Sequence, residues 1–184
     1  MRELEIPGVC LFEPQFHRDE RGHFYESWRG SNFMEQTGVE FVQDNISRSY
    51  QHVLRGLHYQ KKRKQYQLAW VVRGRVLDVV VDLRRDSPVF RKSISRELNE
   101  DNPQQMFMPP GCAHGFCVLS ESADLIYKVS QYHDSSDDAV VRWDDPDLAI
   151  DWPIISPILN SRDAAAPWLR EIPPDQLPSC GVEI

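Results

Sequence analysis

Apolar and polar residues alternate along much of this chain, with the period of two that is typical of β-strands with two unlike faces. In residues 76–83, one face carries only aliphatic side chains, which are Leu77, Val79, Val81 and Leu83. The opposite face carries Asp78 and Asp82 beside two valines. We therefore predict a strand whose second face is either solvated or lines a polar cavity.

Segments of the same character recur at short intervals, and turn-rich stretches such as 99–103 and 144–147 separate them. The predicted strands are 9–13, 23–28, 41–47, 53–60, 67–72, 76–83, 89–98, 105–108, 114–119, 123–132 and 139–143. Helix signals are confined to 31–38, which starts with the capping residue Ser31 and ends in Gly38, and to one or two turns within 161–169. The pattern predicts a mainly β sandwich or barrel with a few short helices.

The chain length of 184 residues, without a recognisable linker, predicts a single domain over 1–184 with an irregular, proline-containing tail from about residue 170. Lys and Arg together number 21 and Asp and Glu 28, which gives a formal net charge of −7. This charge argues against a nucleic-acid polymer as a partner, because such binders usually carry a basic face. A small phosphorylated ligand needs only a few local arginines and stays compatible with the composition.

No apolar run reaches the roughly 18 residues that a membrane-spanning helix needs, so no membrane partner is expected. The N-terminus is acidic and has no apolar signal core, and we therefore expect a cytoplasmic protein. Four cysteines show no C-x-x-C pairing: Cys10, Cys112, Cys117 and Cys180. Without a secretory signal, buried free thiols are expected rather than a disulfide framework.

Two segments set a histidine beside glycine in an otherwise apolar run: His58 in 53–60 and His114 in 108–116. Together they suggest one pocket built by two strands, since glycine lets a ligand or another backbone come close. The histidines could be core residues bonded to carbonyls. They could also be metal ligands, but neither has a second histidine at H-x-H spacing. The third interpretation is acid–base catalysis.

A histidine base needs a neutral imidazole that a carboxylate orients from its other nitrogen. Asp78, Asp82 and Asp163 are candidates for that carboxylate. Tyr127 lies in a predicted strand and could supply an acid on the opposite side of a substrate, or be a plain core tyrosine.

Arginines and amides near these segments suggest an anionic, polar ligand. Arg21 and Arg55 each precede glycine, and a guanidinium matches phosphate oxygens bidentately. Without a ligand, Arg21 could be a turn residue and Arg55 could form an internal salt bridge. Residues 43–45, Gln-Asp-Asn, offer hydrogen-bond donors and acceptors for a base or a sugar, or are simply a polar strand end.

Taken in order, these blocks resemble the dTDP-4-dehydrorhamnose 3,5-epimerase family, also called RmlC. The resemblance extends from Pro14 to about Pro167 and rests on the motifs at 19–26, 41–45, 53–60, 78–84, 109–116, 127–128, 143–146 and 159–163. It implies a cupin-type jelly roll, usually a homodimer, that works without metal or cofactor. It also implies removal of a proton next to the C4 ketone of a nucleotide-linked 4-keto-6-deoxyhexose, and return of a proton to the other face, at C5 and C3.

The resemblance also assigns roles to individual positions. His58 falls at the family's base, Asp163 at the carboxylate that orients the base, and Tyr127 at the proton donor. The positions that match substrate contacts are Arg21, Glu26, Gln43, Asp44, Asn45, Arg55 and His114.

Four further substrate-site positions depart from the residues that are usual in the family. Gln67 stands where a lysine is usual, and its amide can donate a hydrogen bond but carries no charge. His133 stands where the family often has a tyrosine that stacks on thymine. Asp138 stands where a glutamate is common, and Arg162 where a lysine is common. The changes fall at the oxyanion and nucleotide ends of the site and leave the base, its carboxylate and the tyrosine in place.

The resemblance therefore implies an isomerase that inverts C3 and/or C5 of a nucleotide sugar, with dTDP as the expected nucleotide, as in dTDP-L-rhamnose biosynthesis. One alternative is a single-position epimerase of a related nucleotide sugar. Two others belong to different classes: a metal-dependent cupin enzyme, and a sugar-nucleotide binder without activity.

Overall fold

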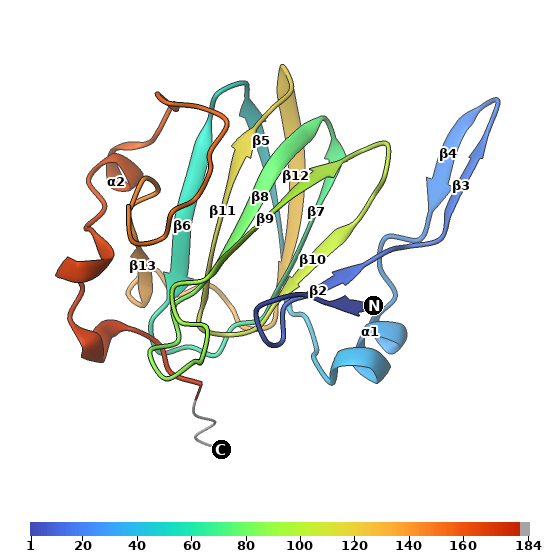
Figure 1. Ribbon diagram of the computed structural model, residues 1–184. Helices are drawn as coiled ribbons and strands as arrows, with labels where there is room; N and C mark the ends of the chain where they lie inside the picture. The colour runs from blue at the N-terminus through green and yellow to red at the C-terminus, as the bar shows by residue number, and fades with distance from the viewer. Residues whose placement is uncertain (181–184) are drawn as a thin grey trace.

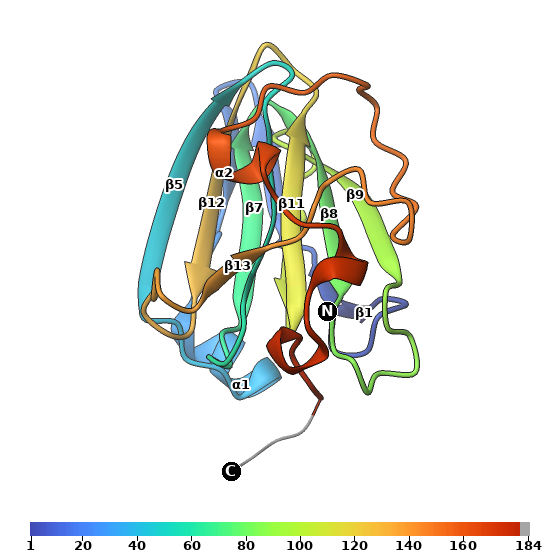
Figure 2. The same ribbon diagram turned by 90° about the vertical axis from the view of Figure 1, so that its left-hand side faces the viewer.

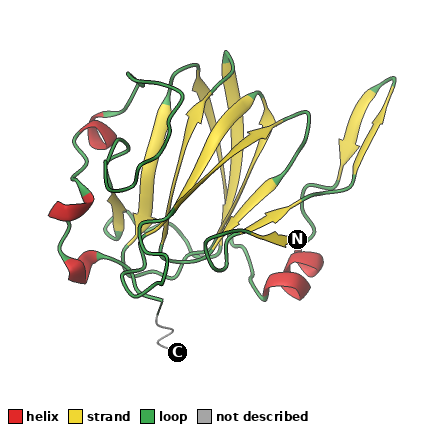
Figure 3. Ribbon diagram, viewed as in Figure 1, coloured by secondary structure: helices red, strands yellow, loops and turns green. Residues whose placement is uncertain are grey.

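The computed structural model describes residues 1–180 and contains two antiparallel sheets packed face to face, as Figure 1 shows. The six-stranded sheet has the order β1 (Arg2–Glu3), β2 (Cys10–Phe12), β10 (Gln105–Met108), β7 (Gln67–Arg73), β12 (Ser122–Val129) and β5 (Gln43–Tyr50). The five-stranded sheet has the order β13 (Asp138–Val140), β6 (Leu54–Gln60), β11 (Cys112–Val118), β8 (Arg75–Asp82) and β9 (Ser93–Asn99). The predicted cupin-type β fold is confirmed, and Figure 3 shows the helices only at its periphery.

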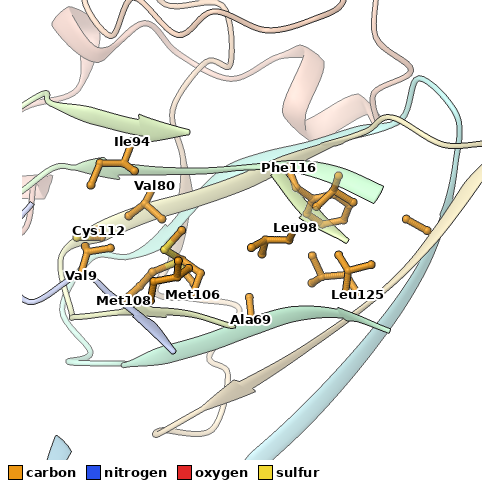
Figure 4. Packing of buried hydrophobic residues seen from close by; sticks show 14 of the residues in the cluster. Val9, Ala69, Val80, Ile94, Leu98, Met106, Met108, Cys112, Phe116 and Leu125 are labelled. Atoms are coloured by element: carbon orange, nitrogen blue, oxygen red, sulfur yellow. The ribbon is translucent and has the colours of Figure 1, made fainter. Parts of the chain in front are cut away.

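The main hydrophobic core fills the space between the sheets, where aliphatic, methionine and aromatic side chains interdigitate (Figure 4). Strand β8 contributes Val76 and Val80 to this core, while Val79 and Val81 pack on its other face against the C-terminal segment. The strand is therefore buried on both faces. The face with Asp78 and Asp82 was predicted to be solvated or to line a polar cavity. It does neither, since both aspartates are fully buried and the cavity between the sheets is lined by other residues.

Asp82 is satisfied inside the protein by its own neighbours. Its carboxylate accepts two hydrogen bonds at 2.8 Å from the guanidinium of Arg84 and one at 2.7 Å from the hydroxyl of Ser87. A buried charge with this many partners is stable without water. Asp82 is thus structural and does not orient a histidine.

An aromatic cluster on the outer face of the six-stranded sheet lies under helix α1 (Gly30–Thr37). Phe33 of the helix stacks at 4.6 Å on Phe12 and at 4.5 Å on Trp28. The helix was predicted over 31–38, and Gly38 does end it, in the left-handed conformation with φ 68°. Ser31 is not the capping residue, because the helix begins one residue earlier and Arg29 occupies the N-cap without a side-chain hydrogen bond.

A two-stranded hairpin of β3 (Phe16–Asp19) and β4 (Gly22–Tyr25) projects from the body of the sandwich (Figure 1). Strand β3 was not predicted, because it is short and three of its four residues are exposed, so no apolar alternation marks it. The side chain of Phe24, which lies opposite His17 in this hairpin, is exposed.

The C-terminal segment covers the outside of the five-stranded sheet, as Figures 1 and 2 show. It contains α2 (Ser161–Ala164) and the 3-10 turns η1 (Leu169–Glu171) and η2 (Pro174–Gln176). Leu169 and Ile172 anchor it in the hydrophobic cluster behind β8. The tail predicted to be irregular therefore holds two short turns up to 176, and residues 181–184 of that prediction lie outside the described residues.

All four cysteines are free, as predicted, but they are not all buried. Cys10, Cys112 and Cys117 are buried, whereas Cys180 is exposed. Among the helices of residues 1–180, none is long and apolar enough to span a membrane.

Strands β6 and β11 approach each other unusually closely at Gly56 and Gly115. A Cβ atom on Gly56 would lie 2.6 Å from the Cα atom of Gly115 and 2.7 Å from the carbonyl oxygen of His114. Gly56 also has φ 120°, a conformation that side-chain-bearing residues rarely adopt. The two glycines therefore allow the histidine-bearing strands to pair.

Replacing Gly56 with alanine should lower the free energy of unfolding by at least about 2 kcal/mol, because the methyl group collides with backbone atoms at an unfavourable φ. Urea denaturation followed by circular dichroism would measure the change. Gly30→Ala is the matched control, since its Cβ meets only Trp28, at 3.9 Å. Equal unfolding midpoints for the two variants would contradict the close packing of β6 on β11.

Candidate active site

A cavity opens between the two sheets at the end where β6, β7, β11 and β12 meet. It is lined by eight of the predicted site residues: Arg55, His58, Gln67, His114, Tyr127, His133, Asp138 and Arg162. Six further residues complete the lining: Ser47, Tyr59, Gln60, Gln65, Phe116 and Leu125. The predicted pocket of two histidine strands is thus present, and side chains from both sheets face it.

His58 is held by the carboxylate of Asp163, 105 residues away in the sequence. The Nε2 atom of His58 lies 2.7 Å from Oδ1 of Asp163, which is fully buried. Asp163 is placed by α2, whose N-cap residue Asn160 accepts a hydrogen bond from its backbone N–H at 2.7 Å. The backbone N–H of Gly56 donates to the second carboxylate oxygen at 3.1 Å.

This contact determines which nitrogen of His58 can act on a ligand. A carboxylate only accepts hydrogen bonds, so the neutral imidazole must carry its proton on Nε2. No described residue bonds to Nδ1, and the ring lines the cavity. The lone pair of Nδ1 is therefore the basic site.

The pKa of Asp163 lies below its usual value. Burial alone would raise it, but the hydrogen bond and charge of His58, the N–H of Gly56 and the charge of Arg162 together more than offset burial. Asp163 therefore stays ionised at neutral pH. Because its folded-state pKa is depressed, its contribution to stability is present above about pH 4 and is lost as the pH falls through the lowered value.

His114 forms a second pair of the same kind, with Asp78. Its Nε2 atom lies 2.7 Å from Oδ2 of Asp78, on the neighbouring strand β8. His114 is also the direct partner of His58 in the β6–β11 register, so the two imidazoles come from adjacent positions. Each ring is engaged by its own carboxylate. Within residues 1–180, no group of three His, Cys, Asp or Glu is arranged to hold a metal ion.

Tyr127 lines the cavity from the opposite sheet. It lies on β12, between Ala69 of β7 and Asn45 of β5. Burial raises the pKa of Tyr127 above its usual value, Asp138 acts in the same direction, and Arg55 opposes them. The phenol therefore keeps its proton at neutral pH and faces the cavity from the wall opposite His58.

Two arginines supply positive charge to the cavity. Arg55 donates to the hydroxyl of Ser49 at 3.0 Å, and no carboxylate of residues 1–180 forms an ion pair with it. Arg162 is paired with Asp138 across the cavity rim. Gln67 contributes a neutral amide, whose Nε2 lies 3.5 Å from Oε1 of Gln65.

Side chains alternate between the two faces of β5, so residues 43–45 do not all point to the same side of the sheet. Gln43 and Asn45 are partly buried on the cavity side, joined by a 2.9 Å hydrogen bond, and Gln43 accepts one from the backbone N–H of His133 at 3.1 Å. They border the cavity without lining it. Asp44 points to the outer face, where it pairs with Lys128 at 2.7 Å, so this chain alone does not bring it to the cavity.

Arg21 and Glu26 also lie outside the cavity of their own chain. Arg21 stands on the projecting hairpin and is paired with Asp19, and Glu26 follows the hairpin and is paired with Arg29. The side chain of Arg21 is largely exposed and that of Glu26 is about half exposed. Their expected contact with a ligand is therefore not made by the fold of a single chain.

Two buried glutamines of the cavity wall, Gln60 and Gln65, were not predicted. The period of two in β6 could have indicated Gln60, since it lies two residues after His58 and so shares its face. Gln65 lies in the loop before β7, where no periodicity applies.

Comparison with known proteins shows the family to which this chain is similar. The family model described as dTDP-4-dehydrorhamnose 3,5-epimerase matches residues 3–171. A protein of that name from Pseudomonas aeruginosa is 47% identical over 163 residues, which cover 87% of this chain and 90% of the relative.

Solved structures give the same result. The epimerase RmlC from Legionella pneumophila, in complex with dTDP-4-keto-L-rhamnose, is 42% identical with a TM-score of 0.93, over 98% of this chain and 97% of that one. ChmJ, a 3'-monoepimerase from Streptomyces bikiniensis in complex with dTDP-quinovose, is 34% identical with a TM-score of 0.90. The match covers 97% of this chain and 93% of that one. The match over nearly the whole chain shows that this protein belongs to the dTDP-4-dehydrorhamnose 3,5-epimerase family of carbohydrate epimerases.

Proposed function

We propose that this protein inverts C3 and C5 of a dTDP-linked 4-keto-6-deoxyhexose by acid–base chemistry alone, as in dTDP-L-rhamnose formation. One observation carries the proposal: a base and an acid face one cavity from opposite walls, His58 from the five-stranded sheet and Tyr127 from the six-stranded sheet. The ligand seen with the Legionella relative supports this class of substrate.

The first step is removal of the hydrogen on a carbon next to the C4 ketone. Nδ1 of His58 takes the proton, and Asp163 stabilises the imidazolium that forms. The electron pair left on carbon is delocalised onto the ketone oxygen as an enolate, to which the N–H of Gln67 can donate. His114, held by Asp78, is a substrate contact in the same cavity.

The second step returns a proton to the opposite face of that carbon. Tyr127 supplies it, because its raised pKa keeps the phenol protonated until the enolate collapses. The tyrosinate regains a proton from water and His58 loses one to water, so the protein ends as it began. No electrons are gained or lost, and the same cycle acts at the second carbon.

The charged residues of the cavity fit the nucleotide part of the substrate. Arg55 and Arg162 are the cations that would bind the diphosphate, which suits a protein of net charge −7 that needs only local positive charge. His133 and Asp138 line the same cavity and would contact the nucleoside.

A single-position epimerase is the second candidate, and Gln67 is the residue that favours it. A neutral amide stabilises an enolate less than the lysine ammonium that is usual at this position. ChmJ, which resembles this chain over most of its length, is a 3'-monoepimerase. With weaker stabilisation, only the more acidic of the two carbons would exchange.

We also propose a homodimer in which the β3–β4 hairpin of each chain reaches the cavity of its partner. The hairpin projects from the sandwich, and its Phe24 is 71% exposed. Arg21 lies on the hairpin and Glu26 follows it, and within a single chain both residues lie outside the cavity. Sedimentation velocity should give a species of twice the chain mass. A monomer at micromolar concentration would contradict this assembly.

We place the protein in the cytoplasm. Its cysteines are all free, including the exposed Cys180, as is usual in a reducing compartment. Recovery of the protein mainly outside the cytoplasm on cell fractionation would contradict this placement.

Deuterium exchange tests the proposed reaction directly. In deuterated water with dTDP-4-keto-6-deoxyglucose, the enzyme should place deuterium at both C3 and C5, and NMR of the product would show which carbons exchange. Exchange at one carbon would establish the single-position epimerase. Tight dTDP binding with no exchange at either carbon would contradict an epimerase and leave a binding protein.

Two variants separate the roles in that experiment. His58→Asn should slow exchange at both carbons by at least about 100-fold, because the base is lost. Tyr127→Phe should slow net inversion more than exchange, because abstraction by His58 survives. Undiminished exchange in His58→Asn, or equal losses of exchange and inversion in Tyr127→Phe, would overturn the respective role.

A further inference from the structure

Arg55 is a cation of the cavity whose charge no carboxylate neutralises within residues 1–180. The residue is exposed and lines the cavity, so a ligand can reach it. An exposed, unpaired arginine samples many rotamers, and fixing one of them on a ligand costs binding free energy. Whatever holds Arg55 before the ligand arrives therefore affects how tightly it binds an anion.

The group that holds Arg55 is the hydroxyl of Ser49. Nε of Arg55 donates a hydrogen bond to Oγ of Ser49 at 3.0 Å. Ser49 lies on β5 of the six-stranded sheet and Arg55 on β6 of the five-stranded sheet, so the bond joins the two walls of the sandwich. Ser49 is 2% exposed and is not among the residues that line the cavity. It is therefore a support behind Arg55 and does not touch a ligand itself.

This bond uses one of the five N–H groups of the guanidinium. No other hydrogen bond within residues 1–180 engages Nη1 or Nη2 of Arg55. These two nitrogens can donate side by side to two oxygens of one phosphate group. The guanidinium also lies near enough to Tyr127, on the opposite wall of the cavity, for its charge to oppose the raised pKa of that phenol.

The neutral character of the support matters as much as its position. A carboxylate would orient a guanidinium too, but it would cancel the charge and compete with a phosphate, as Asp138 does at Arg162. A serine hydroxyl accepts the hydrogen bond and adds no charge. Arg55 is thus oriented while its full positive charge stays available.

We propose that Ser49 is a positioning residue for diphosphate binding, which holds Arg55 by Nε so that its two Nη groups are presented to the phosphate oxygens. The inference rests on the proposed function for its ligand class. Ser49 acts only through Arg55 and lies outside the His58–Asp163 contact, so it affects binding of the nucleotide sugar more than the chemical step.

The variant Ser49→Ala tests the proposal, since it removes the hydroxyl and keeps the rest of the strand. Titration calorimetry should show dTDP bound about 3- to 10-fold more weakly, because Arg55 must then be ordered by the ligand alone. The KM of the nucleotide sugar should rise by a similar factor. The kcat should change by less than about twofold, because only binding common to ground state and transition state is lost.

Two further variants show whether the effect passes through Arg55. Ser87→Ala is the matched control, since it also removes a buried serine hydroxyl bonded to a charged side chain, that of Asp82 at 2.7 Å, but outside the cavity. It should bind dTDP as the wild type does. Arg55→Met removes the group to be positioned, so adding Ser49→Ala to it should weaken dTDP binding no further.

Two results would overturn the proposal. One is a Ser49→Ala variant that binds dTDP within about twofold of the wild type. The other is an equal loss from Ser49→Ala in the wild type and in Arg55→Met, because additive effects mean that the serine does not act through the arginine. Both results leave the epimerase function intact if the wild type exchanges deuterium. A wild type that neither exchanges deuterium nor binds dTDP would contradict the function itself.

Discussion

The contact between Asp163 and His58 is the constraint on which the site depends. It joins a buried carboxylate near the C-terminal end to a strand in the middle of the chain, at 2.7 Å. Removing a carboxylate from water is costly, and here hydrogen bonds from His58 and from the backbone of Gly56 offset that cost. The same contact leaves Nδ1 of His58 as the basic nitrogen. The folded position of Asp163 therefore determines which nitrogen of the ring can accept a proton.

The rest of the architecture serves this contact. Leu169 and Ile172 hold the C-terminal segment against the five-stranded sheet and so keep α2 beside β6. Gly56 and Gly115 let β6 and β11 approach, which sets His58 beside His114. The second sheet then supplies Tyr127 from across the cavity. Two facing sheets are a natural support for inversion, because base and acid must reach opposite faces of one carbon.

Local patterns were enough to predict the sandwich and much of its site. The alternation in 76–83 identified β8, and the glycines beside His58 and His114 indicated one pocket built by two strands. Residue patterns alone left the carboxylate partners open, because these partners depend on long-range docking, and only the resemblance to the family assigned Asp163 to His58. Asp78 reaches His114 through the β8–β11 pairing, and Asp163 reaches His58 only when α2 packs on β6.

Other features escaped prediction for equally physical reasons. Strand β3 has no buried face, so it carries no apolar period, and its pairing with the predicted strand β4 was missed. Asp44 and Asn45 are neighbours in sequence but face opposite sides of β5, and a motif alone does not separate them. The two hydrogen bonds that the Gln60 amide donates go to oxygen atoms of Asp134 and Asp138, which lie more than 70 residues further along the chain.

The protonation of the His58 ring tests the central claim most directly. Nitrogen-15 NMR of histidine-labelled protein, with His58 assigned from the spectrum of His58→Asn, would report both ring nitrogens at a pH where the ring is neutral. A carboxylate that holds Nε2–H predicts a protonated Nε2 and a bare Nδ1 in the wild type, and loss of that preference in Asp163→Asn. A wild-type ring with its proton on Nδ1, or with both tautomers equally populated, would contradict the claim that Asp163 orients the base.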